Sequence, residues 1–332
     1  MLRFPARTQS CQPLPDSLKR PAMKKLLLFI LTFGVLTASF GQTLETVYLN
    51  PKDSSSNMFI AVRPDGVPVK AFMFCIPGAF QTPQYVLQQT NLPVYAAKQG
   101  ILTIIPIFAT GLSSFGVDSL TQQSLKEMLS LVVEKYKLQK KDFFIGGLSI
   151  GGTQAVKYAE LAVQNNYPIK PKAVFGIDPP LDYERLYNSA VRIMRLSVNV
   201  KPNDEIPYMI GRIQNEMHGT PETALQNFYK FSPYSMSDTT QAAIKNLIDT
   251  PLVLITEPAI EWWLTKRGYD YTDINAIDEA GMINELQRLG NKKAILITTH
   301  DKGFREPGHI RHPHSWSIAD PEQLVNWLLQ QS

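Results

Sequence analysis

Short apolar runs alternate with longer amphipathic stretches along the chain. Runs of strand length, mostly β-branched or aromatic and bounded by Gly, Pro or Asp, occupy 71–76, 101–108, 143–146, 173–177, 252–256 and 294–298. Their length and composition predict β-strands. The clearest amphipathic stretch is 118–138, where apolar residues recur at helical spacing and predict a helix. Strands that alternate with such helices predict a mainly parallel sheet covered by helices on both faces.

Two parts of the pattern depart from this alternation. The stretches 47–50 and 58–69, together with the strand 71–76 that follows them, predict an antiparallel edge, with a turn at 64–66. The interval 179–249 has a mostly helical pattern, lacks a clear strand and is too long for one crossover helix. We therefore predict an inserted helical cap over the carboxyl ends of the strands, which divides the core into 42–178 and 250–332.

The first 41 residues have the pattern of a targeting segment. From Met23, two lysines are followed by a predominantly apolar run over 26–36 and by the small residues Ser39 and Gly41. This order predicts a secretory signal peptide that is cleaved between Gly41 and Gln42. The run is shorter than the roughly 20 residues that a membrane-spanning helix needs. We expect a secreted or periplasmic protein without a stable membrane anchor.

Removing that segment changes the charge of the chain. Residues 1–41 hold six of the 33 Lys and Arg residues but one of the 29 acidic residues, which leaves 27 basic and 28 acidic side chains. This balance provides no basic surface of the kind that nucleic acids require, so we expect no nucleic-acid partner. After residue 41 the chain contains one cysteine, Cys75, in an apolar run. An apolar core, and not a disulfide, must therefore stabilise this part.

A glycine-rich turn surrounds one serine between a predicted strand and a predicted helix. The sequence DFFIGGLSIGGTQAVKYAE contains GLSIG at 147–151, which matches the pattern G-x-S-x-G. In a nucleophile elbow the serine occupies a strained strand-to-helix turn, and small neighbours let the strand and helix approach closely. The motif and its context predict that Ser149 is a nucleophile. They also predict that the backbone N–H of Ile150, at the helix N-terminus, faces a developing oxyanion.

With this turn, the chain resembles the α/β-hydrolase superfamily over 44–330. The resemblance implies an α/β-hydrolase fold with a second oxyanion donor in the turn after the strand that ends FCIPGAF. The family's usual His-Gly pair is replaced there by Pro77-Gly78. The implied donor is the backbone N–H of Ala79, with that of Phe80 as the alternative.

The same resemblance implies a catalytic base near the C-terminus. The stretch HPHSWSIADPEQLVNWLL looks like the family's last loop and helix, where the histidine precedes an Asp-Pro-Glu helix start by about half a dozen residues. His314 has this spacing, and Asp320 and Pro321 predict the helix start by themselves. His312 is the alternative. A histidine cluster can also bind zinc, but this spacing matches no standard motif, so we expect no metal.

The acid of the triad is left open by the resemblance. The family most often places it after the strand that precedes the last one, where Glu257 follows the run 252–256. A minority of members place it one strand earlier, where Asp178 follows 173–177. Glu261, one turn into a predicted helix, is a third candidate. We take Glu257 as the first choice and Asp178 as the alternative.

These residues together predict a serine hydrolase of acyl bonds. Ser149 attacks the acyl carbonyl, His314 transfers the proton and the acid orients the histidine, through an acyl-enzyme and without a cofactor. We expect a small-molecule carboxylic ester as the substrate, with a peptide as the alternative. The competing class is a non-catalytic binding protein of the same fold, although such relatives usually lose the serine or histidine that this chain keeps. The oligomeric state is not predicted.

Signal cleavage makes a direct prediction about the exported protein. Because the small residues end at Gly41, N-terminal sequencing of that protein should begin at or near Gln42. An intact N-terminus on membrane-embedded protein would contradict it.

Overall fold

The computed structural model describes residues 42–50, 56–196 and 205–332. The predicted signal peptide lies outside these residues. The strands are β1 Gln42–Tyr48, β2 Met58–Pro64, β3 Ala71–Ile76, β4 Ile101–Ile107, β5 Asp142–Leu148, β6 Ala173–Ile177, β7 Leu252–Thr256, β8 Ala294–Thr298, β9 Phe304–Arg305 and β10 Ile310–Arg311. The helices are α1 Pro83–Gln89, α2 Leu92–Lys98, α3 Ser119–Lys135, α4 Ile150–Gln164, α5 Tyr183–Leu196, α6 Glu205–Met217, α7 Pro221–Phe231, α8 Ile260–Arg267, α9 Ala276–Arg288 and α10 Pro321–Leu329, with short 3₁₀ helices η1 Ile244–Leu247 and η2 Trp316–Ile318. Among these, no helix combines the length and apolar character that crossing a bilayer requires.

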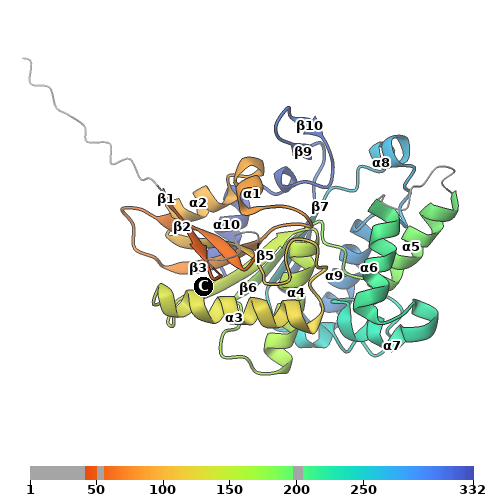
Figure 1. Cartoon of the computed structure of the whole chain (residues 1–332), viewed down its shortest axis with the longest axis horizontal. Helices are drawn as coiled ribbons and strands as arrows, with labels where there is room; N and C mark the ends of the chain where they lie inside the picture. Colours follow the sequence, from red (N-terminus) through yellow and green to blue (C-terminus); the bar gives the residue numbers. More distant parts are fainter. Residues whose placement is uncertain (1–41, 51–55, 197–204) are drawn as a thin grey trace, which may run out of the picture. The chain divides into compact units, whose positions relative to one another are not determined.

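The main sheet is mostly parallel, as predicted. Within the described residues its strands follow the order β1-β2-β4-β3-β5-β6-β7-β8 (Figure 1). All neighbours from β4 to β8 pair in parallel, whereas β2 pairs antiparallel with β1 and with β4. The antiparallel edge therefore joins the sheet through β4 and not through β3, the next strand in the chain. A separate hairpin of β9 and β10 follows β8.

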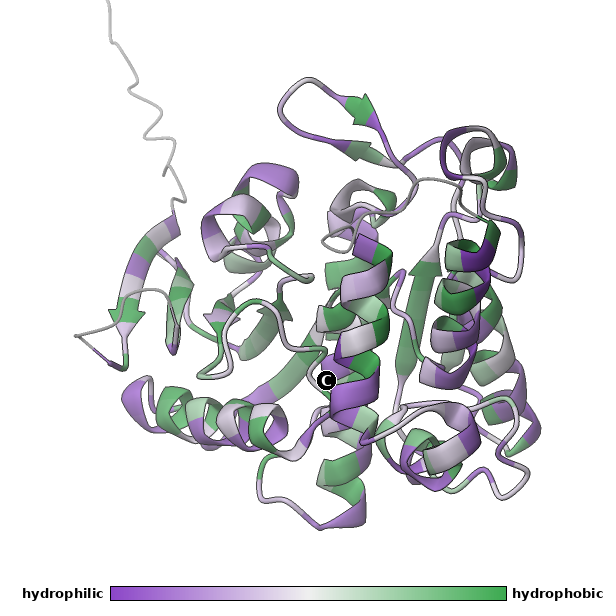
Figure 2. Ribbon diagram, turned by 45° about the vertical axis from the view of Figure 1, so that its right-hand side comes forward, coloured by the Kyte–Doolittle hydropathy of each residue, from purple (hydrophilic) through white to green (hydrophobic). Residues whose placement is uncertain are grey.

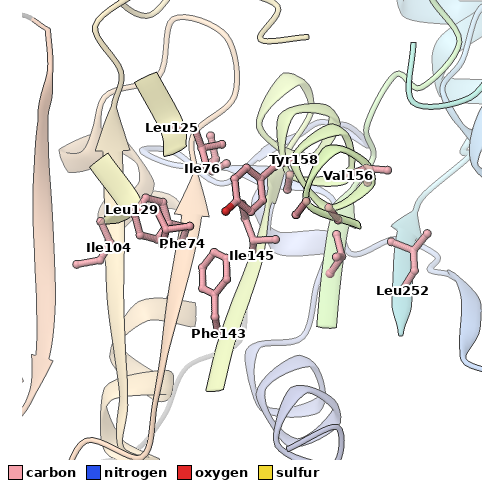
Figure 3. Close-up of a cluster of buried hydrophobic side chains, with 14 of the residues drawn as sticks. Phe74, Ile76, Ile104, Leu125, Leu129, Phe143, Ile145, Val156, Tyr158 and Leu252 are labelled. Atoms are coloured by element: carbon pink, nitrogen blue, oxygen red, sulfur yellow. The ribbon is translucent and has the colours of Figure 1, made fainter. Parts of the chain in front are cut away.

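Helices cover both faces of this sheet. On one face, α3, α4 and α9 pack against the strands, and the predicted apolar positions of α3 are buried there (Figure 3). On the other face lie α2 and α10. The helices alternate hydrophilic and hydrophobic residues, whereas the central strands are predominantly apolar (Figure 2). The carboxyl ends of the parallel strands are left at one edge, between these two layers.

The interval 179–249 contains α5, α6, α7 and η1 among its described residues. The first three helices enclose an apolar cluster of their own, which includes Tyr183, Met217 and Phe228 and also contacts Ile150. Figure 1 shows these helices beside one end of the sheet. In contrast, Ile244 and Leu247 of η1 are buried in the main core. Of these elements, η1 therefore packs with the main core and not with α5, α6 and α7.

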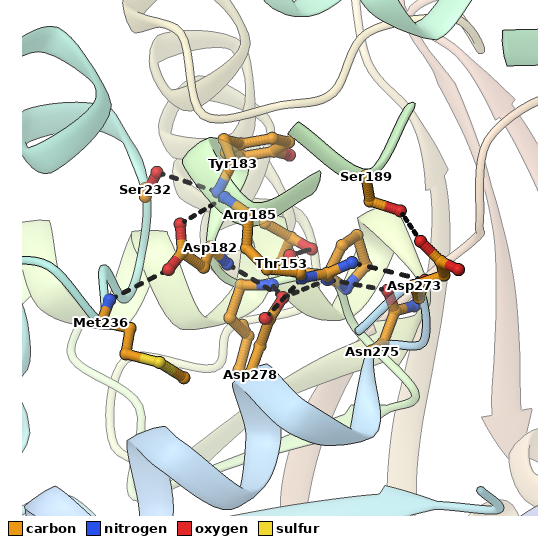
Figure 4. Close-up of polar contacts among 12 residues, drawn as sticks. Thr153, Asp182, Tyr183, Arg185, Ser189, Ser232, Met236, Asp273, Asn275 and Asp278 are labelled. Carbon is orange, nitrogen blue, oxygen red and sulfur yellow. Dashed lines mark hydrogen bonds and ion pairs between the residues drawn. The ribbon is translucent and has the colours of Figure 1, made fainter. Parts of the chain in front are cut away.

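A buried polar network fixes the segment that follows β6 to the start of α9 (Figure 4). The carboxylate of Asp278 accepts the N–H groups of Leu181 and Asp182, both at 3.1 Å, and forms an ion pair with Arg185. The side-chain amide of Asn275 donates to the carbonyl of residue 178 at 2.9 Å. Because buried charges are stable only when they are paired and hydrogen-bonded, this network defines the path of the chain after β6.

Glu279, next to Asp278 on α9, is fully buried, and neither oxygen of its carboxyl group has a hydrogen-bond partner in the described structure. Burial, together with the charges of Asp178 and Asp278, raises the pKa of Glu279 well above its usual value. The folded protein thus keeps this proton at a pH where the unfolded chain releases it. Stability is therefore lost as the pH rises from the unfolded pKa towards the folded one.

Glu279→Gln should remove this pH-dependent loss. Relative to wild type, its free energy of unfolding should rise by up to about 1.4 kcal/mol per pH unit above about pH 4.5, and the difference should be constant below that pH. Urea unfolding measured across this range tests the prediction. Glu261→Gln, at an exposed position, is the matched control. Parallel pH profiles of Glu279→Gln and wild type would contradict it.

Candidate active site

Ser149 lies in the turn between β5 and α4. Its φ of 55° and ψ of −129° fall in a region that residues other than glycine rarely adopt. The N–H of Ser149 donates to the carbonyl of Ile177 at 2.8 Å, and the N–H of Thr153 donates to the carbonyl of Ser149 at 3.1 Å. These bonds hold the strained strand-to-helix turn that the glycine-rich motif predicts.

Two glycines flank this turn because the backbone of β3 leaves no room for a side chain. A Cβ on Gly147 would lie 2.1 Å from the carbonyl oxygen of Ile76, and one on Gly151 would lie 2.2 Å from the same atom. Either contact is far inside van der Waals distance. Any larger residue would therefore push β5 and α4 away from the end of β3.

His314 is hydrogen-bonded to Asp178, the alternative acid. Its Nδ1 lies 2.5 Å from Oδ2 of Asp178, which follows β6 directly. The other carboxylate oxygen of Asp178 accepts the hydroxyl of Thr256 at 2.8 Å. The backbone of Asp178 has a φ of 48°, and Asn275 binds its carbonyl. Hydrogen bonds from strand β7 and helix α9 thus fix the acid.

Glu257, our first choice for the acid, is not the partner of His314 in the structure. It lies at the tip of β7 as predicted, but its carboxylate accepts the N–H groups of Lys302 at 2.8 Å and Gly303 at 3.1 Å. It also forms an ion pair with Arg311. The chain after β8 folds back over β7 and occupies this carboxylate, which leaves the position beside the histidine to Asp178.

The alternative histidine, His312, is enclosed by aromatic rings. Its ring centroid lies 4.9 Å from that of Trp262 and 5.7 Å from that of Trp263. Burial, and then the nearby charges of Arg305, His314 and Arg267, lower the pKa of His312 to about 3. Its Nδ1 accepts the backbone N–H of His314 at 3.2 Å. This neutral ring supports the loop that carries His314. In the described residues, no three His, Cys, Asp or Glu side chains are grouped to hold a metal.

The turn after β3 contains both candidates for the second oxyanion donor. The N–H of Phe80 donates to the carbonyl of Leu112 at 2.9 Å and is therefore occupied. This leaves the N–H of Ala79 as the remaining candidate for the donor. The Oε1 atom of Gln81 accepts from the N–H of Gly78 at 3.2 Å and from the indole of Trp316 at 2.9 Å. Gln81 thus connects this turn to the segment just after His314.

A cavity of about 320 Å³ joins these groups. Ser149, Ile150, Ala79 and His314 line one part of it. The remaining wall is mostly apolar or aromatic and comes from the cap and from the segment after β7, with Leu186, Ile193, Ile206, Tyr208, Met209, Trp263 and Tyr269. A site with four convergent polar groups and an apolar wall is typical of small-molecule binding.

Solved structures share this architecture. Carboxyl esterase 2 from the mycorrhizal fungus Tuber melanosporum has a TM-score of 0.56 at 15% identity, covering 89% of this chain and 87% of its own. An S-formylglutathione hydrolase from Agrobacterium tumefaciens has a TM-score of 0.55 at 12% identity, covering 88% and 96%. A hormone-sensitive lipase from a metagenome library also has a TM-score of 0.55, at 10% identity, covering 88% and 87%. The chain has the α/β-hydrolase fold. No protein-family model and no curated protein matches the sequence.

Within the α/β-hydrolase fold, this chain pairs its histidine with the acid that follows β6, the placement expected of a minority of members. Two further residues contribute to the site and were not predicted from the sequence. Thr256 donates its hydroxyl to Asp178, but at the end of an apolar strand it looked like an ordinary strand residue. Arg305 lines the cavity from the hairpin after β8. A charged residue in a stretch with four histidines is the one hint that could have drawn attention to Arg305.

Proposed function

We propose that this protein is a serine hydrolase that cleaves carboxylic esters, with Ser149, His314 and Asp178 as its catalytic triad. The observation that carries the proposal is the His314–Asp178 hydrogen bond at the wall of the cavity that Ser149 also lines. The fold it shares with esterases and a lipase supports an ester as the substrate. The non-catalytic alternative is less favoured because the chain retains all three groups.

In this mechanism each group has a distinct role. Since Nδ1 of His314 is bonded to Asp178, Nε2 is left to take the proton from the Ser149 hydroxyl as its oxygen attacks the acyl carbon. Asp178 stabilises the imidazolium that results. The N–H groups of Ala79 and Ile150 then stabilise the tetrahedral oxyanion, each by about 3 kcal/mol. The imidazolium protonates the leaving alcohol, which leaves an acyl-enzyme. His314 then takes a proton from water as the water attacks the acyl carbon, and it gives this proton to the Ser149 oxygen as the carboxylic acid is released.

The cavity and the predicted signal peptide bear on the substrate and on the place of action. A volume of about 320 Å³ with apolar walls fits a small ester better than an extended peptide, which remains the alternative substrate. The predicted signal peptide supports action outside the cytoplasm, in the periplasm or medium.

Ser149→Ala should abolish ester hydrolysis and leave the fold unchanged. The variant lacks the nucleophile, so kcat for a short-chain aryl ester should fall by about 10⁴-fold or more. A fluorophosphonate probe should label wild type and not the variant. Equal turnover by both proteins would refute the proposed function.

The two carboxylates should separate into one needed for turnover and one needed for stability. Asp178→Asn should lower kcat by up to about four orders of magnitude at an unchanged melting temperature, because an amide cannot stabilise the imidazolium. Glu257→Gln, the matched control, should instead lower the melting temperature, because Arg311 loses its buried carboxylate partner and keeps only the exposed Asp301, at a cost of about 1–3 kcal/mol. Its turnover per folded molecule should change little. The opposite ranking of the two variants would return the acid to Glu257.

A further inference from the structure

Arg305 is a cationic side chain in direct contact with the backbone of the proposed catalytic base. It ends strand β9, and its Nε and Nη2 atoms donate to the backbone carbonyl of His314 at 3.3 and 2.8 Å. It is half-buried and lines the same cavity as Ser149 and His314. Its Nη1 atom has no hydrogen-bond partner in the described part of the chain, so part of the guanidinium is available to a ligand.

The absence of a carboxylate partner distinguishes Arg305 from the other half-buried arginines. Each of those forms an ion pair with an acidic side chain, as seen for Arg185, Arg192, Arg212 and Arg311. Among the described residues, no carboxylate lies within ion-pair distance of Arg305. Guanidinium keeps its proton in proteins, so this charge stays in place. A partly desolvated cation without a counter-ion is costly, and a bound anion would offset that cost.

The charges around Arg305 leave room for such an anion. The exposed Arg267 adds positive charge from α8, and Glu205, which lines the cavity from α6, adds negative charge at longer range. Asp273 also lines the cavity but is already paired with Arg192. Asp178 is bonded to His314. The remaining acids therefore leave the guanidinium of Arg305 without a direct counter-ion.

The neighbouring wall favours a flat ligand. Trp263 and Tyr269 line the same cavity and are stacked, with ring centroids 5.7 Å apart and planes inclined by 6°. Aromatic faces of this kind bind planar groups well.

We infer that Arg305 binds a carboxylate of the substrate, so that the preferred substrates are esters that carry a free carboxylate apart from the ester bond. This rests on the proposed function and specifies its substrate class. The guanidinium holds the carboxylate through a charge-assisted hydrogen bond while Ser149 attacks the ester bond in the same cavity.

Matched ester pairs test this inference. The pairs are 4-acetoxybenzoate with its methyl ester, which places the charge on the alcohol side, and monomethyl glutarate with dimethyl glutarate, which places it on the acyl side. Wild type should have the higher kcat/KM for the charged member of at least one pair. Arg305→Gln should lower the charged-to-neutral ratio in that pair by about tenfold or more, and Arg305→Lys should retain part of it.

The charged-to-neutral ratio separates binding of the substrate carboxylate by Arg305 from the support that Arg305 gives to His314. Because Arg305 also holds the carbonyl of His314, its loss lowers kcat/KM for both esters of a pair by the same factor. This factor cancels in the charged-to-neutral ratio. Two neighbouring charges are the controls. Glu205→Gln should raise the ratio, and Arg267→Gln, at an exposed position, should lower it less than Arg305→Gln does.

The outcomes separate this inference from the proposed function. Hydrolysis of the neutral esters with a ratio that Arg305→Gln does not change would refute the inference and leave the function standing. If wild type neither hydrolyses any of the four esters nor reacts with the fluorophosphonate probe, the proposed function is refuted. If Ser149 is labelled but none of the four esters is hydrolysed, the inference is tested by the rate of labelling in the presence of small ligands. Benzoate should slow labelling of wild type more than benzamide does, and less so in Arg305→Gln, whereas equal protection would overturn the inference.

Discussion

The close packing of the β5–α4 turn against the end of β3 is the constraint on which the site depends. The carbonyl of Ile76 occupies the space where side chains of residues 147 and 151 would lie, so both must be glycine. This contact places the strained Ser149 and the N-terminus of α4 beside the turn that carries Ala79. The proposed nucleophile and the two proposed oxyanion donors are thus positioned by one close approach of two backbone segments. The histidine and the acid have only to reach this edge from the loops that follow β8 and β6.

Two neighbouring parallel strands each present a carboxylate near the proposed catalytic histidine. Asp178 and Glu257 end the adjacent strands β6 and β7, whose spacing of roughly 4.8 Å brings both carboxylates to the same edge. The chain after β8 decides between them, because the N–H groups of Lys302 and Gly303 turn towards Glu257. Glu257 then serves the loop that carries the base, and Asp178 serves the base itself. Each carboxylate satisfies donors that would otherwise be buried without partners.

Local features of the sequence predicted most of the elements, and long-range contacts account for the errors. The six core strands, the amphipathic α3 and the Asp320 cap of α10 follow from period and capping chemistry, which involve residues close in sequence. The pairing of β2 with β4 could not be predicted, since β3, α1 and α2 separate these two strands in the chain. The partner of His314 lies 136 residues away, and its identity depends on a loop conformation that leaves no periodic signal. Arg305 likewise reaches the cavity only through the hairpin that follows β8.

The one cysteine after residue 41, Cys75, lies near the end of β3 and is fully buried, and burial raises the pKa of its thiol above the usual range. Thiolate is the form that reacts with alkylating reagents, so Cys75 is effectively inert in the folded protein. In protein that begins at Gln42, a cysteine placed at Ile310, which is 64% exposed on the β9–β10 hairpin, would be the sole thiol open to a spin label or a fluorophore. Protein that begins at Gln42 is therefore suited to site-specific spectroscopy of the hairpin without prior removal of a background thiol.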